Sequence, residues 1–238
     1  MPDVVVTERQ RKGSSVILKS TSICAVVGAT LLLVATMLHP MSADPGDPVA
    51  AFTEYAADRF WVASHLGQFF GVGLIFAGLY GLTRSLQGDA TEWLANLGLL
   101  FALAALAMAA ALQAVDGIAL KVMVDRWAAA ALAQKPSAFD VAFAVRQIEI
   151  GAASFTAMLF GTAGILFGIS LAASALYPTW LGWLAIIGGA GTAIGGGVTA
   201  FSGFSSAAMN VAMPFNLLMI IWIALIGIVM WRRANRNK

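Results

Sequence analysis

The sequence predicts an all-α, polytopic membrane protein: a bundle of six transmembrane helices with an extended extracytoplasmic helical hairpin between spans 3 and 4. Two properties predict this class. Of the 238 residues, 60% are hydrophobic and 11% are charged, whereas soluble domains have about 25% charged residues. Uncharged runs long enough to cross a bilayer, which takes about 20 residues, recur along the chain. The lipid bilayer is therefore the first expected partner.

Six spans account for the uncharged runs. Three runs in the first half of the chain each hold one span, whereas the run from Ile150 to Trp231 contains no Asp, Glu, Lys or Arg and is long enough for three. Proline, glycine and serine at 176–180 and 201–210 predict the turns that divide it. The predicted spans are residues 21–40, 60–83, 93–115, 150–175, 180–200 and 211–231.

The distribution of charge predicts the orientation of the spans. Six spans place both termini on one side, where nine of the 14 basic residues and four of the 12 acidic residues fall. The positive-inside rule then predicts cytoplasmic termini, in a bacterial cytoplasmic (inner) membrane. The expected organisation is a cytoplasmic tail at 1–20, a six-helix transmembrane domain at 21–231 and a basic cytoplasmic tail at 232–238. Cleavage of span 1 as a signal peptide is not expected, because Met41 occupies a position where a small residue is needed.

The hairpin is predicted from the segment between spans 3 and 4. Residues 118–134 are rich in Ala, Leu, Val and Met, so span 3 is expected to continue as a helix beyond the membrane. The chain is then expected to turn at Lys135–Ser137. Ser137 is a suitable N-cap for the returning helix, with Asp140 at the third helical position.

Seven polar side chains gather near the outer boundary of the predicted spans, where they form a candidate ligand-binding site. Six of them form pairs three residues apart, and residues at this spacing share a helix face. They are His39 and the pairs His65–Gln68, Gln113–Asp116 and Arg146–Glu149. The alternative interpretation is that each side chain only marks where a helix leaves the hydrocarbon, with Trp61, Trp127 and Tyr55 as ordinary interface anchors.

Asp116 is the most unusual member of this set, because it follows more than twenty residues without a charge. Lys121 lies five residues further on, about 140° around a continuous helix, and is therefore a poor partner for Asp116 unless Gly117 breaks the helix. Lys121 pairs better with Asp125, one turn on. A partner for Asp116 is expected from another helix, with Arg146 or His65 as the candidates.

Other kinds of site have little support in the sequence. One cysteine, Cys24, permits no internal disulfide and no cysteine-based zinc or iron–sulfur site. His39 and His65 could in principle hold a transition metal or haem together with a carboxylate, but nothing in their spacing is diagnostic, so no metal and no cofactor are expected. A net charge of +2, with basic residues at the two ends, gives no support to nucleic-acid binding.

Span 5 is unusually rich in glycine. Gly191 and Gly195 form a G-x-x-x-G pattern, and five further glycines lie between residues 182 and 197. Small faces of this kind let membrane helices approach closely, so the first interpretation is helix packing. The same face would also suit a homodimer, leave room for a ligand or let the helix bend.

Three stretches of the chain resemble a group of uncharacterised bacterial six-span membrane proteins. They are LHPMSADPGDPVAAFTEYAADRFWVASHLGQFFGVGL, AVDGIALK and VRQIEIG, and the resemblance covers most of the chain beyond residue 20. The matching features are His39, Pro40, Trp61, His65, Gln68, Asp116, Lys121 and Glu149. The resemblance implies the six-span architecture and brings no activity with it.

Three functions fit these features, and the sequence does not decide whether the protein is an enzyme. The first is a polar pocket near the outer leaflet that binds or transports a small or lipid-like ligand. The second is an intramembrane enzyme that uses His65, Asp116 and Glu149 in acid–base chemistry on an apolar substrate. The third is an accessory or structural membrane subunit whose outer hairpin contacts a partner. The inner halves of the spans carry few polar residues, which weakens the case for transport of ions.

Overall fold

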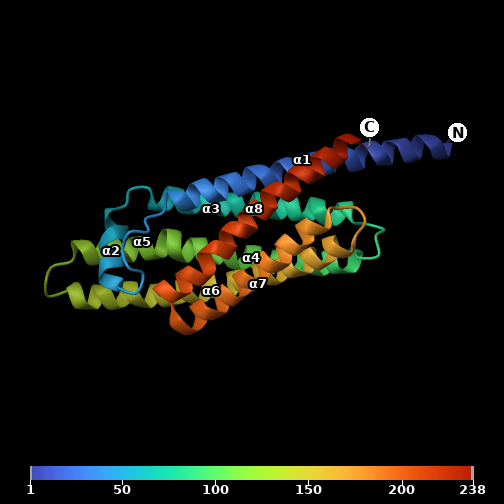
Figure 1. The fold of residues 1–238 in the computed structure, drawn as a ribbon. Coiled ribbons are helices and arrows are strands. Elements are labelled where there is room, and N and C mark those ends of the chain that lie inside the picture. The colour runs from blue at the N-terminus through green and yellow to red at the C-terminus, as the bar shows by residue number, and fades with distance from the viewer. Residues whose placement is uncertain (1, 237–238) are drawn as a thin grey trace.

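The structure is a computed structural model that describes residues 2–236, and these residues are helical over most of their length (Figure 1). The elements are α1 (Pro2–Met37), α2 (Pro48–Ala57), α3 (Trp61–Ser85), α4 (Glu92–Ala114), the π-helix η1 (Val115–Leu120), α5 (Lys121–Ala129), α6 (Lys135–Ala173), α7 (Thr179–Ser202) and α8 (Ser206–Arg236). Residues 2–236 contain no β-strand. The predicted all-α class is confirmed.

Six helical segments of the described chain are long and apolar enough to cross a membrane, as the sequence predicts. One of them is continuous through α4, η1 and α5. They are Ser15–Met37, Trp61–Ser85, Glu92–Ala129, Lys135–Ala173, Thr179–Ser202 and Ser206–Arg236. The protein therefore has the build of a multi-pass membrane protein.

Two helices begin earlier than the predicted spans. The first helix starts at Pro2, within the predicted tail, since proline is favoured at the first position of a helix. The last starts at Ser206, within the predicted turn at 201–210. That turn needs only three residues, because Gly203 ends α7 with φ at +63° and the hydroxyl of Ser205 accepts a hydrogen bond from the Ala208 N–H.

The helix that returns from span 3 also begins slightly early. The chain turns at residues 130–134, before the expected Lys135–Ser137, and α6 starts at Lys135. Ser137 is not the N-cap, since its hydroxyl donates to the Gln134 carbonyl at 3.0 Å inside the first turn. Pro136 explains the shift, because proline is pre-organised for the first turn and needs no N–H partner there.

The long helices run roughly along one axis, and both ends of the chain lie at the same end of the bundle (Figure 1). We call this the terminus end. The short helices α2 and α5 lie at the opposite end, which we call the α2 end. The candidate site lies toward the α2 end.

The glycines of α7 pack inside this chain. Gly189 lies against the backbone of α6 at Gly161 and Ile165. Gly191 meets the ring of Phe215 in α8, and a Cβ on Gly195 would lie 2.9 Å from the Ala212 Cα. The small face of span 5 therefore brings α6 and α8 close to α7, as the packing interpretation predicts.

Two apolar cores hold the helices together. The larger one runs along the bundle and includes Phe167, Leu181 and Trp222, all fully buried. The smaller one lies at the α2 end, where α2 and α5 pack on α6, and contains Phe52, Trp61, Leu120, Val124, Trp127 and Ala142. The polar side chains of the candidate site lie next to this second core.

Candidate ligand-binding site

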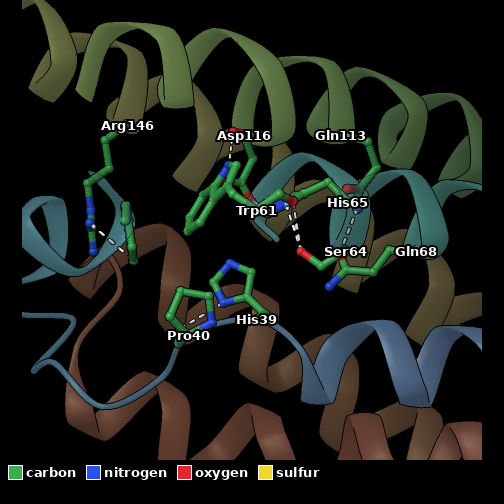
Figure 2. A network of polar contacts seen from close by, with 10 residues as sticks. His39, Pro40, Trp61, Ser64, His65, Gln68, Gln113, Asp116 and Arg146 are labelled. Carbon is green, nitrogen blue, oxygen red and sulfur yellow. Dashed lines mark hydrogen bonds and ion pairs between the residues drawn. The ribbon is translucent and has the colours of Figure 1, made fainter. Parts of the chain in front are cut away.

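Two of the predicted polar pairs face one another across α3 and the α4–η1 segment. The Nε2 of His65 lies 2.9 Å from Oδ2 of Asp116, and Nε2 of Gln113 donates to Oε1 of Gln68 at 3.1 Å (Figure 2). The side chain of His65 is 2% exposed and that of Asp116 is 14% exposed. The expectation that Asp116 finds its partner on another helix is confirmed, and the partner is His65.

A local widening of the helix brings Asp116 and His65 together. Residues 115–120 form a π-helix, an irregularity that is frequent at functional sites. Within it, Gly117 has no side chain to separate the helices, since a Cβ at this position would lie 2.6 Å from the Cβ of His65. The indole of Trp61 donates to the Asp116 carbonyl at 3.0 Å. Backbone geometry and a buried donor thus fix the position of this carboxylate.

Lys121 does not pair with Asp116, as expected, although the expectation assumed a continuous α-helix and residues 115–120 form a π-helix. Its ammonium group lies 2.7 Å from Oδ1 of Asp125, one turn further along the helix. The same group donates to the carbonyls of Tyr55 and Ala56 at the end of α2, at 3.1 and 3.2 Å. Lys121 therefore fixes α2 to α5 and takes no part in the pair of Asp116.

Arg146 was the other expected partner of Asp116, and the structure places its guanidinium elsewhere. Arg146 is 2% exposed and donates to the Pro45 carbonyl at 2.9 Å and to the Tyr55 hydroxyl at 3.4 Å. It also faces three aromatic rings, each 5.6 Å from its central carbon. These acceptors and π-faces satisfy the cation, so Arg146 joins α6 to the α2 loop.

His39 joins the site from the loop that follows α1. Its ring centroid lies 4.6 Å from that of Trp61 and 5.1 Å from that of His65, and Figure 2 shows it opposite these two residues. The Nδ1 of His39 lies 2.8 Å from the Pro40 carbonyl and donates to it. Burial lowers the pKa of His39, against a smaller opposite effect of Asp116. The ring is therefore neutral at pH 7, with a lone pair on Nε2.

Several buried acceptors in the site lack a hydrogen-bond partner among the described residues. They are Oε1 of Gln113, Oδ1 of Asp116 and Oε2 of Glu149. Glu149 is 6% exposed, and it lies within electrostatic range of Asp116 and Arg146. A buried polar group without a partner costs about 1–3 kcal/mol. Three such acceptors in one region indicate a site built to meet donors or a cation.

An apolar cavity of about 320 Å³ lies directly beside this polar layer. Helical spacing places the cavity next to the polar layer, because residues four apart share a helix face. The cavity-lining residues Val72 in α3, Ala109 in α4 and Ala153 in α6 each lie four positions from a polar residue of the site. These polar residues are Gln68, Gln113 and Glu149, respectively. Each helix thus presents its polar residue one turn away from the cavity wall.

The second core closes the other side of the polar layer, and it contains residues whose role the sequence did not reveal. Trp61 is 1% exposed and packs on both histidines, so the alternative that it is an interface anchor is wrong. Tyr55 packs against Trp61 with a centroid distance of 4.3 Å and an angle of 42° between the ring planes. Burial raises the pKa of Tyr55 to about 12, so its hydroxyl is neutral. The i, i+4 spacing of Trp61 and His65 was the available sequence signal, because it places both side chains on one face of α3.

The site is thus a polar layer between the second apolar core, with Trp61 and Tyr55, and the apolar cavity. Comparisons with protein-family models, with curated proteins and with solved structures find no match for this chain. The function proposed below therefore rests on the chemistry of these three layers.

Proposed function

We propose that this protein binds a lipid-like small molecule, with the apolar part of the ligand in the cavity and its polar group in the polar layer. This layer consists of His39, His65, Gln68, Gln113, Asp116 and Glu149. The observation that carries the proposal is the order of the layers. On three different helices, a cavity-lining residue lies one turn from a polar residue of the site. An amphipathic molecule matches this order, with one apolar and one polar end.

The size and lining of the cavity support a ligand of this kind. Small-molecule sites occupy about 300–1,000 Å³ and are mostly apolar with a few placed polar groups. This cavity has about 320 Å³, and its lining is aliphatic and aromatic apart from four residues: Thr36, Thr156, Thr192 and Asn216. The hydroxyl of Thr192 is a further buried group without a partner among the described residues.

The unsatisfied groups of the polar layer favour a particular headgroup. Gln113, Asp116 and Glu149 each present an oxygen that accepts hydrogen bonds. A ligand that satisfies them carries donors, as an alcohol or an amine does, whereas a carboxylate or phosphate ester would add further acceptors beside two carboxylates. The favoured class is therefore an apolar alcohol or amine.

The membrane orientation proposed from the sequence fits this function. A crossing takes about 20 residues, whereas α6 has 39, so half of α6 extends beyond the hydrocarbon. With both termini in the cytoplasm of a bacterial cell, the α2 end and the α5–α6 hairpin are extracytoplasmic and the site faces the outer leaflet. Reporter fusions at Gly46 and after Lys238 test this orientation, and an extracytoplasmic C-terminus would contradict it.

The ligand is tested by filling the cavity. Ala105 lines the cavity and is 3% exposed, whereas Ala104 on the same helix is exposed and does not line it. Mass spectrometry of the organic extract of purified protein should detect a stoichiometric apolar alcohol or amine in the wild type and in Ala104→Leu. Ala105→Leu should lose it and keep its thermal stability. An extract without such a molecule, or one equally present in Ala105→Leu, would contradict the proposal.

A second candidate function rests on the way His65 is held. Its Nδ1 lies 2.7 Å from the Trp61 carbonyl and its Nε2 lies 2.9 Å from Asp116, an arrangement that orients an imidazole for proton transfer. In that case the bound molecule would be a substrate. Incubation of the extracted ligand with ligand-free protein would reveal its conversion, and an unchanged ligand would favour binding alone.

A further inference from the structure

Two imidazoles and one carboxylate converge in the polar layer. The nitrogens of His39 and His65 and a carboxylate oxygen of Asp116 all lie within 4.8 Å of one another. Two ligands bound to zinc at about 2.0–2.1 Å in a tetrahedral site are about 3.4 Å apart. The most distant of the three donor atoms therefore need to approach one another by about 1.4 Å at most, and Nε2 of His65 and Oδ2 of Asp116, which are 2.9 Å apart, need to separate by about 0.5 Å. Small rotations of the side chains provide such shifts.

The outer hydrogen bonds of both rings match those of metal-bound histidines. Such histidines almost always donate their other N–H to a carbonyl or carboxylate, which fixes the tautomer. The Nδ1 of His39 donates to the Pro40 carbonyl at 2.8 Å, and the Nδ1 of His65 donates to the Trp61 carbonyl at 2.7 Å. Both rings thus keep Nε2 for the interior of the site.

The contact between His65 and Asp116 already contains a place for a cation. With Nδ1 of His65 donating to Trp61, both Nε2 of His65 and Oδ2 of Asp116 present lone pairs across 2.9 Å. A proton or a metal ion must lie between them. His39 faces the same point from the loop after α1 (Figure 2). There it supplies a third ligand to a metal ion, whereas a proton shared by His65 and Asp116 needs no third partner.

The surrounding charge also favours a cation. Oδ1 of Asp116 and Oε2 of Glu149 are buried and have no hydrogen-bond partner among the described residues. Glu149 is 6% exposed and lies within electrostatic range of Asp116. Asp116 supplies one carboxylate to the site, Glu149 adds a second carboxyl group within electrostatic range of it, and the opposing guanidinium of Arg146 is held by Pro45 and Tyr55.

We propose that His39, His65 and Asp116 bind a divalent first-row transition-metal ion of the zinc class at the polar end of the cavity. Two imidazoles with one carboxylate suit such ions better than Mg²⁺ or Ca²⁺, which prefer oxygen ligands. Three protein ligands leave a coordination position open, as in catalytic zinc sites. That position lies in the polar layer where the proposed ligand would bind. The metal site is inferred from its own donor atoms and does not depend on that ligand.

Cobalt binding tests the proposal directly. Protein without a histidine tag is treated with EDTA in detergent, dialysed and titrated with Co²⁺, whose visible absorption reports low-coordinate nitrogen and oxygen ligation. We expect one equivalent of Co²⁺ that Zn²⁺ displaces. His39→Ala and Asp116→Asn should each weaken binding at least about tenfold. Asp125→Asn is the control, since this carboxylate lies on the neighbouring helix, pairs with Lys121 and is outside the site.

Wild type without stoichiometric binding, or both site variants with wild-type affinity, would overturn the proposal. A second readout needs no variant: the electron paramagnetic resonance spectrum of Cu²⁺-loaded wild type should show coupling to two imidazole nitrogens, and a spectrum from oxygen ligands alone would also overturn it. The cavity variant Ala105→Leu separates this proposal from the proposed function. It should lose the lipid-like molecule and keep the Co²⁺ site.

Discussion

The protein has a layer of polar side chains at each end of its bundle, and the two layers differ in how their hydrogen-bonding atoms are satisfied. At the terminus end, Asp89 accepts hydrogen bonds from the N–H and hydroxyl of Thr91 and from the hydroxyl of Ser174. Ser170 donates to Thr91, and Ser85 bonds to Tyr177. None of these side chains is among the buried groups without a partner in the described part of the chain.

The polar layer near the α2 end is different, because three of its acceptors have no hydrogen-bond partner among residues 2–236 as the structure describes them. Native structures satisfy nearly all of their buried polar groups, and exceptions need an explanation. A layer with all its partners holds connecting loops in place, and a layer with unsatisfied acceptors loses stability unless something binds there. The comparison therefore favours a structural role for the terminus end and supports the proposal that the α2 end binds a ligand.

The largest effect is expected from adding a side chain at Gly117. A Cβ there would lie 2.6 Å from the Cβ of His65, so Gly117→Ala must push η1 away from α3. Overpacking of this kind costs about 1–3 kcal/mol, and the His65–Asp116 contact should be lost with it. Chemical unfolding and the Co²⁺ titration measure the two effects.

Gly151→Ala is the matched control for that change, since a Cβ at Gly151 meets nothing within 4 Å. This variant should be stabilised by up to about 1 kcal/mol through helix propensity. Equal behaviour of the two glycine variants would show that the close approach at Gly117 is not needed.

Removal of Asp116 should cost more than removal of Lys121. Asp116→Ala leaves Nε2 of the buried His65 without its partner, at a cost of about 1–3 kcal/mol. Lys121→Ala removes a partly exposed pair with Asp125 and two bonds to the end of α2, at a cost of about 1 kcal/mol. Thermal unfolding of both variants in detergent gives the order. Equal small shifts would mean that Asp116 only marks the helix end.

Substitutions in the two layers should change stability in opposite directions. Glu149→Leu removes a buried carboxyl group, one oxygen of which has no hydrogen-bond partner among the described residues, so the ligand-free protein should gain about 1 kcal/mol. Ser170→Ala removes the donor that satisfies Thr91 at the terminus end, so it should lose about 1 kcal/mol. Unfolding of ligand-free, EDTA-treated protein measures both. A loss of stability in both variants would contradict the assignment of binding to the α2 end.

The smallest effect is a pH dependence at the terminus end. The backbone N–H of Thr91 is the largest cause that lowers the pKa of Asp89 below its ordinary value, and the Thr91 and Ser174 hydroxyls add to it. The resulting stabilisation is complete above the ordinary value of 3.8 and is lost as the pH falls through the lower, folded-state pKa. Between pH 5 and pH 3, wild type should therefore lose more stability than Asp89→Asn. Parallel curves would remove Asp89 from the account.

The sequence predicted the parts of this protein that follow from helical period and hydrophobic length. Long uncharged runs predict the spans because each run must cross the bilayer. The three-residue spacing within His65–Gln68 and Gln113–Asp116 predicts that each pair shares a face. The predicted lack of pairing between Asp116 and Lys121 is also confirmed, since Lys121 pairs with Asp125, although the predicted angle assumed a continuous α-helix and residues 115–120 form a π-helix.

The remaining features depend on contacts between segments that are far apart in the chain. The π-helix at 115–120 has no sequence signature, and its register follows from the packing of Gly117 on His65. Arg146 finds its acceptor 101 residues away, at Pro45. The cavity is defined by residues from six helices, so its volume depends on how the helices pack. The sequence of one helix does not determine how far that helix lies from its neighbours.

The most direct test of the binding layer is an experimental map of the protein purified in native lipid nanodiscs. We expect elongated density in the cavity between Ala105, Phe160 and Met219, with its polar end within hydrogen-bond distance of Gln113 or Asp116. Side chains that collapse to fill the cavity, or density whose polar end points toward the terminus end, would contradict it.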